Sequence, residues 1–307
     1  MRVDKEKPTG LVKARSADLA IGSASLAARG LNHLRLMESA DHWLKRGREY
    51  SRQCRAGEAL KCFVRGVQLD PHDAELQLEI GKLYFFGEGV PEDKPQGVSW
   101  YRKAAEQGLA EAQDYLGDAY GAGKGVSSDN SQATEWYRKA AVQGHAGAQS
   151  RLGDAYASGR GVKEDHVLAI FWWSKAAELG YANAQYNLAN LLDEGKHIAK
   201  DEVQALSWWH KAAEQGHGSA KFVLAVLYDE GKRLPQDLDK AFQYFRDAAK
   251  SWDSEALFRV GQAYEMGRGT VQSSEEAAHF YGLARWAAAC KARAKRFEIE
   301  TGEAITG

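Results

Sequence analysis

The sequence predicts an all-α protein in which helix hairpins stack on one another as a solenoid. The first observation behind this prediction is a repeated string. KAAEQG begins at Lys103 and again at Lys211, with KAAVQG at Lys139 and KAAELG at Lys175 between them. The strings are 36 residues apart each time, so six units align without insertion or deletion. The second observation is that apolar residues recur inside each unit at helical spacing, and the third is that glycines recur at fixed positions between the helices. A fixed period of this length is typical of folds in which each unit buries its apolar face against its neighbours.

The composition predicts a packed core. The 307 residues include 41 basic and 42 acidic side chains, and 44% of them are hydrophobic, which is too many for a largely disordered chain. No apolar run is long enough for a membrane helix, and the basic N-terminal region makes a poor signal peptide. The three cysteines are too few for a disulfide framework. These features favour a cytoplasmic location.

Two segments precede the six units. Residues 1–39 show no repeat pattern, and we expect an N-terminal extension that is partly disordered, with Leu26, Leu31 and Leu34 on a short capping helix. Residues 40–73 predict one tetratricopeptide-like hairpin, because marker residues fall at the intervals of that repeat. These markers are Trp43, Gly47, Tyr50, Ala59, Phe63 and Pro71.

Residues 74–289 contain the six 36-residue units, and their first helices share a pattern. Position 8 is always glycine or alanine, which lets a second helix approach closely. The glycine at position 14 predicts a left-handed cap at the end of the first helix. The aspartate or serine at position 20 predicts an N-cap for the second helix. The position-14 residues are Gly87, Gly123, Gly159, Gly195, Gly231 and Gly267, and the position-20 residues are Asp93, Asp129, Asp165, Asp201, Asp237 and Ser273.

The second helix of each unit pairs two aromatic residues at positions 27 and 28 with an alanine at position 31. Because the alanine lies four residues after the first aromatic residue, the two share one face of the helix. In the first four units a glycine at position 35 (Gly108, Gly144, Gly180 and Gly216) then turns the chain into the next unit. In the last unit Leu283, Arg285 and Ala288 replace the usual Lys, Ala and Gly, and residues 290–307 are expected to form a C-terminal capping helix and tail.

The six units resemble Sel-1-like repeats, which are relatives of the tetratricopeptide repeat with a longer, glycine-containing loop between the helices. The strings LGDAYGAGKGV (residues 116–126) and EWYRKAAVQG (residues 135–144) carry the resemblance. It implies a right-handed α-α superhelix, a solenoid of stacked helix hairpins whose first helices line a concave face. It also implies a role in assembling a signalling, secretion, envelope or quality-control complex.

No catalytic constellation is apparent in the sequence. The string GAGKG (residues 121–125) lacks the earlier glycine and the following Ser or Thr of a phosphate loop. His145 and His217 share a unit position that also holds Leu109 and Tyr181, which favours packing or surface roles over metal binding. We therefore predict that the protein is not an enzyme and binds no cofactor and no metal.

The charge of the array disfavours nucleic-acid binding. Residues 66–307 hold 27 basic and 35 acidic side chains, whereas an array that reads RNA needs a basic groove for the phosphates. The predicted partner is therefore a protein, without nucleic acid and without membrane insertion.

The predicted partner-binding site is the concave face that the resemblance implies, with positions 2, 5, 9, 12 and 13 of each unit pointing into it. Its charged residues fit either a binding surface or a solvated face. The aromatic residues at position 5 fit either partner binding or packing between repeats. We predict an adaptor that holds a peptide or helix of a partner, with a basic partner favoured by the aspartates. The predicted partner-binding residues are Asp114, Asp118, Asp154, Tyr186, Asn190, Asp193, Phe222, Asp229, Glu230 and Phe258.

An alternative function stays open at this point. The resemblance extends to cysteine-rich relatives with weak β-lactam-related activity. It therefore allows an enzyme or enzyme inhibitor of β-lactam or cell-wall type that acts through a site completed by a partner.

Overall fold

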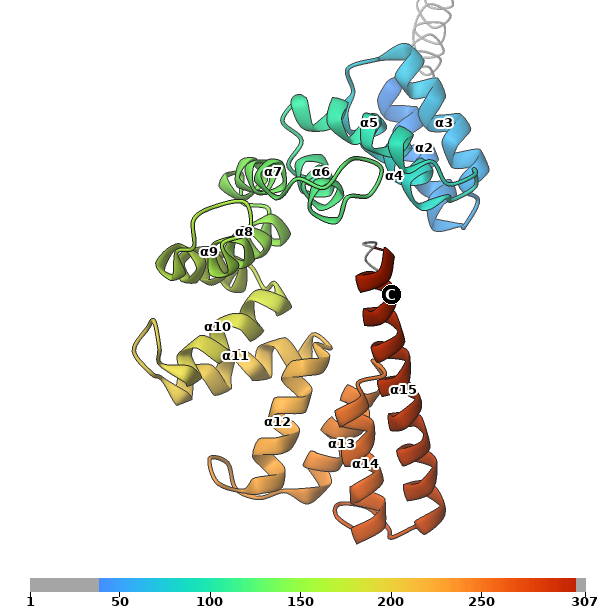
Figure 1. Ribbon diagram of the computed structural model, residues 1–307. Helices are drawn as coiled ribbons and strands as arrows, with labels where there is room; N and C mark the ends of the chain where they lie inside the picture. The colour runs from blue at the N-terminus through green and yellow to red at the C-terminus, as the bar shows by residue number, and fades with distance from the viewer. Residues whose placement is uncertain (1–38, 302–307) are drawn as a thin grey trace, which may run out of the picture. The chain divides into compact units, whose positions relative to one another are not determined.

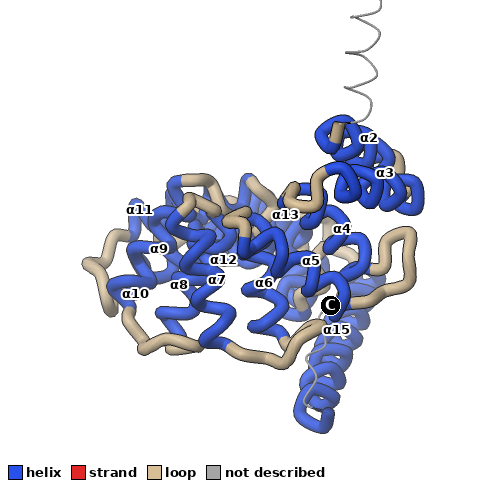
Figure 2. Tube along the Cα trace, turned by 90° about the horizontal axis from the view of Figure 1, so that it is seen from above, coloured by secondary structure: helices blue, strands red, loops and turns tan. Residues whose placement is uncertain are grey.

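The computed structural model describes residues 39–301, which contain helices joined by loops and no strand (Figures 1 and 2). Consecutive helices pack as antiparallel hairpins, which confirms the predicted all-α solenoid class. The predictions made for residues 1–38 lie outside the described residues. The helices are α2 (Ala40–Arg52), α3 (Ala56–Leu69), α4 (Ala74–Phe86), α5 (Lys94–Glu106), α6 (Ala110–Ala122), α7 (Asn130–Val142), α8 (Ala146–Ser158), α9 (His166–Glu178), α10 (Ala182–Glu194), α11 (Glu202–Glu214), α12 (Gly218–Glu230), α13 (Leu238–Ala249), α14 (Ser254–Met266) and α15 (Ser274–Thr301).

The fold divides into two compact units between Ala112 and Gln113, inside α6. In the first unit, α2 pairs with α3 and α4 pairs with α5. Phe63 of α3 is fully buried, and its ring lies where a side chain on Gly47 of α2 would have to be. Leu76 and Ile80 of α4 join the same core, so the two hairpins share one apolar cluster.

In the second compact unit of the fold, which begins at Gln113, each hairpin packs on the next hairpin through its second helix. The helix α9 contacts α10, α11 contacts α12, and α13 contacts α14, in addition to the contact within each hairpin. The core between hairpins is built from alanines and large rings: Trp209 and Ala212 of α11 pack in one cluster with Leu224 of α12. This is the packing of large against small side chains that the repeat pattern predicts.

The loops between helices follow the predicted turn chemistry. All six position-14 glycines have φ between 65° and 71°, the left-handed conformation that an L side chain adopts only with strain. All six position-20 residues accept a hydrogen bond from a backbone N–H in the first turn of the second helix, as Asp165 does from Leu168 at 3.0 Å. These caps are confirmed.

The small residue at position 8 makes room for the ring at position 28 of the same hairpin. A Cβ atom on Gly153 would lie 2.6 Å from Cδ1 of Trp173, closer than two carbon atoms can approach. The same holds for Gly117 against Tyr137, at 2.5 Å. In these hairpins the ring of the second helix therefore packs directly on the glycine of the first helix.

The last helix, α15, is 28 residues long, about twice the length of the other helices. Its first half pairs with α14 as the second helix of the sixth repeat. Its second half continues in the same helix and contains the segment from residue 290 for which a cap was predicted. No helix among the described residues is long and apolar enough to cross a membrane.

Candidate functional site

Polar contacts connect neighbouring first helices on the face where partner binding was predicted. Arg151 of α8 reaches back to α6, where its guanidinium lies 2.9 Å from Asp114 Oδ2 and 2.7 Å from Asp118 Oδ1. Burial lowers the pKa of Arg151, but the two carboxylates outweigh this effect and raise it. Asp114 and Asp118 are therefore charge-compensated within the chain.

Position 9 of the first helix also bonds to the ring at position 28. Tyr137 donates its hydroxyl to Asp118 at 2.8 Å, and Trp173 donates its indole N–H to Asp154 at 2.9 Å. Trp209 makes the same bond to Asn190 Oδ1 at 3.0 Å. The predicted site residues Asp118, Asp154 and Asn190 thus each hold the two helices of their own hairpin together.

Asp154 occupies an unusual environment for a carboxylate. It accepts hydrogen bonds from Trp173 and, at 3.0 Å, from Asn187 Nδ2 of α10. Burial raises the pKa of the Asp154 carboxyl, and these hydrogen bonds oppose the rise. A half-buried carboxylate that accepts two hydrogen bonds from within the chain is a structural acceptor, so Asp154 is not placed to attract a charged ligand.

Within the described part of the chain, the side-chain hydrogen bonds and ion pairs that join α6 to α8 and α8 to α10 have no counterpart between the helices α10 and α12. At the position where Arg151 and Asn187 reach back, α12 has Val223, and at position 9 it has Val226. Neither valine offers a hydrogen-bonding group, and a groove with a cavity volume of about 570 Å³ lies here. We call it the α10–α12 groove. It is lined by Asn190, Asp193, Trp209, Phe222, Val223, Val226, Leu227, Glu230, Lys232 and Arg233.

Four of the predicted site residues meet in the α10–α12 groove: Asn190, Asp193, Phe222 and Glu230. The two carboxylates are not free, because Arg233 binds Asp193 and Lys232 lies 3.3 Å from Glu230. The groove therefore has an apolar floor and ion pairs at its edge.

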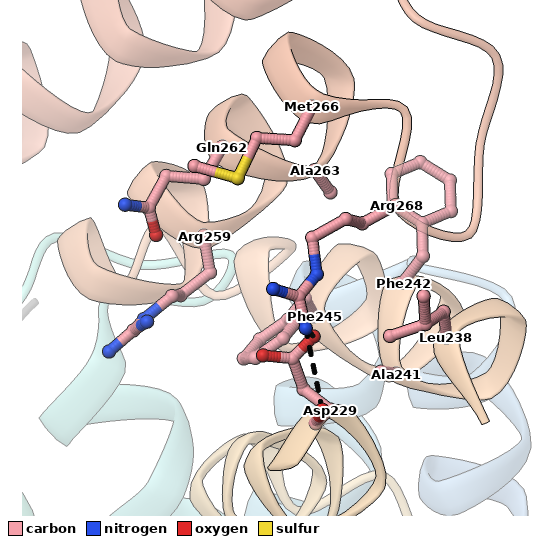
Figure 3. A pocket seen from close by; sticks show the side chains of 10 residues that line it. All are labelled: Asp229, Leu238, Ala241, Phe242, Phe245, Arg259, Gln262, Ala263, Met266 and Arg268. Atoms are coloured by element: carbon pink, nitrogen blue, oxygen red, sulfur yellow. Dashed lines mark hydrogen bonds and ion pairs between the residues drawn. The ribbon is translucent and has the colours of Figure 1, made fainter. Parts of the chain in front are cut away.

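A smaller pocket lies between the next two hairpins, with a cavity volume of about 150 Å³ (Figure 3). The Arg268 side chain reaches into it and binds Asp229 Oδ1 at 2.8 Å, as the dashed line in Figure 3 shows. Phe242 and Phe245 of α13 line the same pocket. Asp229 is thus, like Asp114, Asp118 and Asp193, a predicted site residue whose charge an arginine from the following repeat compensates.

The three aromatic residues at position 5 have different surroundings. Tyr186 stacks on His217 with ring centroids 4.7 Å apart, which is packing between repeats. Phe222 packs edge-on against Phe245 at 5.6 Å and lines the α10–α12 groove. Phe258 is 41% exposed and lies 5.3 Å from Tyr281 near the C-terminal end. They do not form one continuous anchor.

Sequence reasoning placed Val226 on the concave face at position 9 but missed the other apolar residues of the groove, Trp209, Val223 and Leu227. A signal for it is present in the repeat alignment. In the three repeats where position 9 is Asp or Asn, the ring at position 28 donates a hydrogen bond to it, as Trp173 does to Asp154. In the repeat of Val226, position 28 is Phe245, which has no hydrogen-bond donor.

The α10–α12 groove contains amide, carboxylate and cationic side chains but no nucleophile beside a base. Among the described residues, no group of three His, Cys, Asp or Glu side chains could hold a metal ion. His145 and His217 instead accept backbone N–H groups through Nδ1, each at 3.2 Å, and so cap α8 and α12. The arrangement is suited to contact with another molecule's apolar side chains.

Comparisons with known proteins agree with the repeat pattern. The family model described as Sel1 repeat matches residues 74–109, 110–145, 146–181, 182–217, 218–251 and 254–285, which confirms the resemblance. The chain is similar to a solved Sel1 repeat protein from Oxalobacter formigenes, with 30% identity and a TM-score of 0.69, over 79% of this chain and 96% of that one. It is also similar to c5321, a protective antigen of uropathogenic Escherichia coli strains with an SLR fold. That match has 28% identity and a TM-score of 0.57, over 81% of this chain and 62% of that one. No curated protein matches the chain.

Proposed function

The chain belongs to the Sel1 repeat family, and from that premise we propose that it is an adaptor whose α10–α12 groove holds a segment of a partner protein. Members of this family are generally protein-interaction scaffolds. The observation that carries the proposal is that the polar contacts joining α6 to α8 and α8 to α10 have no counterpart at Val223 and Val226, where an apolar groove lies instead.

The groove supports a partner segment with an apolar anchor. Its volume of about 570 Å³ lies within the range of ordinary ligand pockets and accommodates a few large side chains. The partly exposed Phe222 offers a ring surface of the kind that usually dominates the energy of such contacts, and Trp209, which is 3% exposed, packs beneath the groove. The segment can be a helix or an extended peptide, since both can present apolar side chains at one face.

The charges at the groove edge modify the expected preference for a basic partner. A basic side chain of the partner has to compete with Arg233 for Asp193 and with Lys232 for Glu230. Exchange of one cation for another gains little free energy. We therefore expect the charges to act on the association rate and the apolar contacts to determine how long the complex lasts.

Site-specific photo-crosslinking tests the proposal. A photo-reactive amino acid replaces Val226 in the groove, and in a matched variant it replaces Phe171, an exposed ring on the second helix α9. We expect a covalent complex with a partner from Val226 and none from Phe171 in cells that produce the protein. Cross-links at Phe171 with none at Val226 would place the partner on the second helices and would refute partner binding in the α10–α12 groove.

No observation in the structure favours the alternative of a β-lactam or cell-wall activity. Turnover of nitrocefin by the purified chain, against a heat-denatured control, tests that alternative separately from partner binding.

A further inference from the structure

The C-terminal end of the array has a groove of its own, between α14 and the first half of α15. Its cavity volume is about 540 Å³, and Glu255, Phe258, Tyr281, Ala284, Arg285 and Ala288 line it. We call it the C-terminal groove. It is separate from the α10–α12 groove, with which it shares no residue.

The C-terminal groove corresponds to the place where each earlier hairpin receives the next first helix. In the preceding repeat, Phe245 and Ala248 belong to a buried cluster with Ala256 and Val260 of α14. The equivalent residues of the last repeat are Tyr281 and Ala284, and no further hairpin follows them among the described residues. The groove is therefore shaped to receive one helix, and it leaves Phe258 41% exposed.

The last repeat differs from the others in having basic side chains beside the C-terminal groove. Position 32 is alanine in the five preceding units but Arg285 here, and Arg285 is exposed. Because α15 continues past the groove, the face that carries Ala284 and Ala288 also carries Lys291. No described residue forms an ion pair with Arg285 or Lys291. Of the residues that line the groove, the acidic one, Glu255, is bound by Arg259 at 3.0 Å.

We propose that the C-terminal groove binds an amphipathic helix with acidic flanks that a partner protein contributes. The apolar strip along Phe258, Tyr281 and Ala288 takes the apolar face of that helix. Arg285 and Lys291 take its carboxylates. A second copy of this chain is disfavoured as the occupant, since two copies of α15 would bring like charges together. A membrane surface is disfavoured because the apolar strip is recessed in a groove and its α15 portion is mostly alanine.

Two synthetic peptides of about 14 residues, long enough for one helix of a repeat, test the proposal on the full chain. One has leucines at i, i+3, i+4 and i+7 and glutamates at the other positions, and its counterpart has lysines in place of the glutamates. We expect the glutamate peptide to bind with a dissociation constant below roughly 1 mM and the lysine peptide to show no binding. The double variant Arg285→Glu, Lys291→Glu should weaken binding about tenfold or more at low salt, and Phe258→Ala should weaken it at any salt concentration.

The matched control is Arg293→Glu, the same charge change on α15 at a position roughly 140° around the helix from Ala288. It should leave binding of the glutamate peptide unchanged. The proposal is overturned by equal binding of both peptides, by equal loss in the control variant, or by no binding at about 1 mM peptide. It is also overturned if sedimentation shows a dimer that Phe258→Ala dissociates, or if vesicles of anionic phospholipid bind the chain through Arg285 and Lys291.

Discussion

Asp154 is the residue whose substitution separates a structural acceptor from a binding residue. Its carboxylate accepts hydrogen bonds from Trp173 at 2.9 Å and Asn187 at 3.0 Å, and Trp173 is 7% exposed. Asp154→Ala removes the acceptor from both donors. A buried donor without a partner costs about 1–3 kcal/mol, so we expect a loss of about 2 kcal/mol in the free energy of unfolding. For the compact unit that begins at Gln113 and contains Asp154, this loss of stability corresponds to a fall of roughly 4–8 °C in Tm.

Asp154→Asn should behave differently, because it keeps an oxygen at the same place. The next repeat already uses this arrangement, in which Asn190 accepts from Trp209 at 3.0 Å. Burial raises the pKa of Asp154 in the folded chain, so the folded state binds a proton more readily than the unfolded state does. The ionised carboxylate is therefore disfavoured at pH 7, and its cost fades as the pH falls toward the ordinary value of 3.8.

Thermal unfolding followed by far-UV circular dichroism at pH 7 and at about pH 5 measures these differences. We expect Asp154→Asn to be at least as stable as the natural chain at pH 7, with the gain smaller at the lower pH. An alanine variant as stable as the natural chain, or an asparagine variant as unstable as alanine, would refute the assignment of Asp154 as a structural acceptor.

Three further predictions concern the turns and caps. Gly159→Val places a β-branched residue at φ 67° and should lower stability by at least about 1–2 kcal/mol in a melting experiment, whereas an unchanged Tm would contradict the cap. Burial lowers the pKa of His217, whose Nδ1 accepts from Ala220, so its contribution to stability is complete above the unfolded value of 6.5 and is lost as the pH falls below it. His217→Asn keeps an N-cap and should flatten the dependence of Tm on pH in this range, and an unchanged slope would rule out His217 as its source. Trp252 has a left-handed φ of 59° and stands where four earlier repeats have glycine, so its backbone is strained. Trp252→Gly should raise the free energy of unfolding by about 1 kcal/mol in denaturant titrations, and a decrease would count against this backbone strain.

The turns and caps could be predicted from the sequence because their chemistry is local. The left-handed φ of Gly159 and the N-cap of Asp165 depend on a few neighbouring residues, and the 36-residue period shows each position six times. The ring at position 28 could likewise be expected to pack against a small residue, as Trp173 does on Gly153.

The candidate site could be predicted only in part, because its electrostatics depend on distant partners. Asp193 and Asp229 have the spacing of exposed acidic residues, but arginines 40 and 39 residues later bind them. No local rule states how far an arginine in the following loop reaches. The expected field of free aspartates is therefore replaced by ion pairs, and the apolar residues Val223 and Val226 mark the groove instead.

The rate at which the chain dissociates from the partner identified by cross-linking tests binding in the α10–α12 groove most directly. Phe222→Ala removes an anchor from the groove, Phe222→Leu keeps most of its apolar volume, and Phe171→Ala removes a comparable ring from the second-helix face. With the partner immobilised, we expect Phe222→Ala to dissociate about tenfold faster or more, Phe222→Leu to lie between it and the natural chain, and Phe171→Ala to match the natural chain. Equal dissociation rates for Phe222→Ala and the natural chain, or faster dissociation of Phe171→Ala alone, would contradict partner binding in the α10–α12 groove.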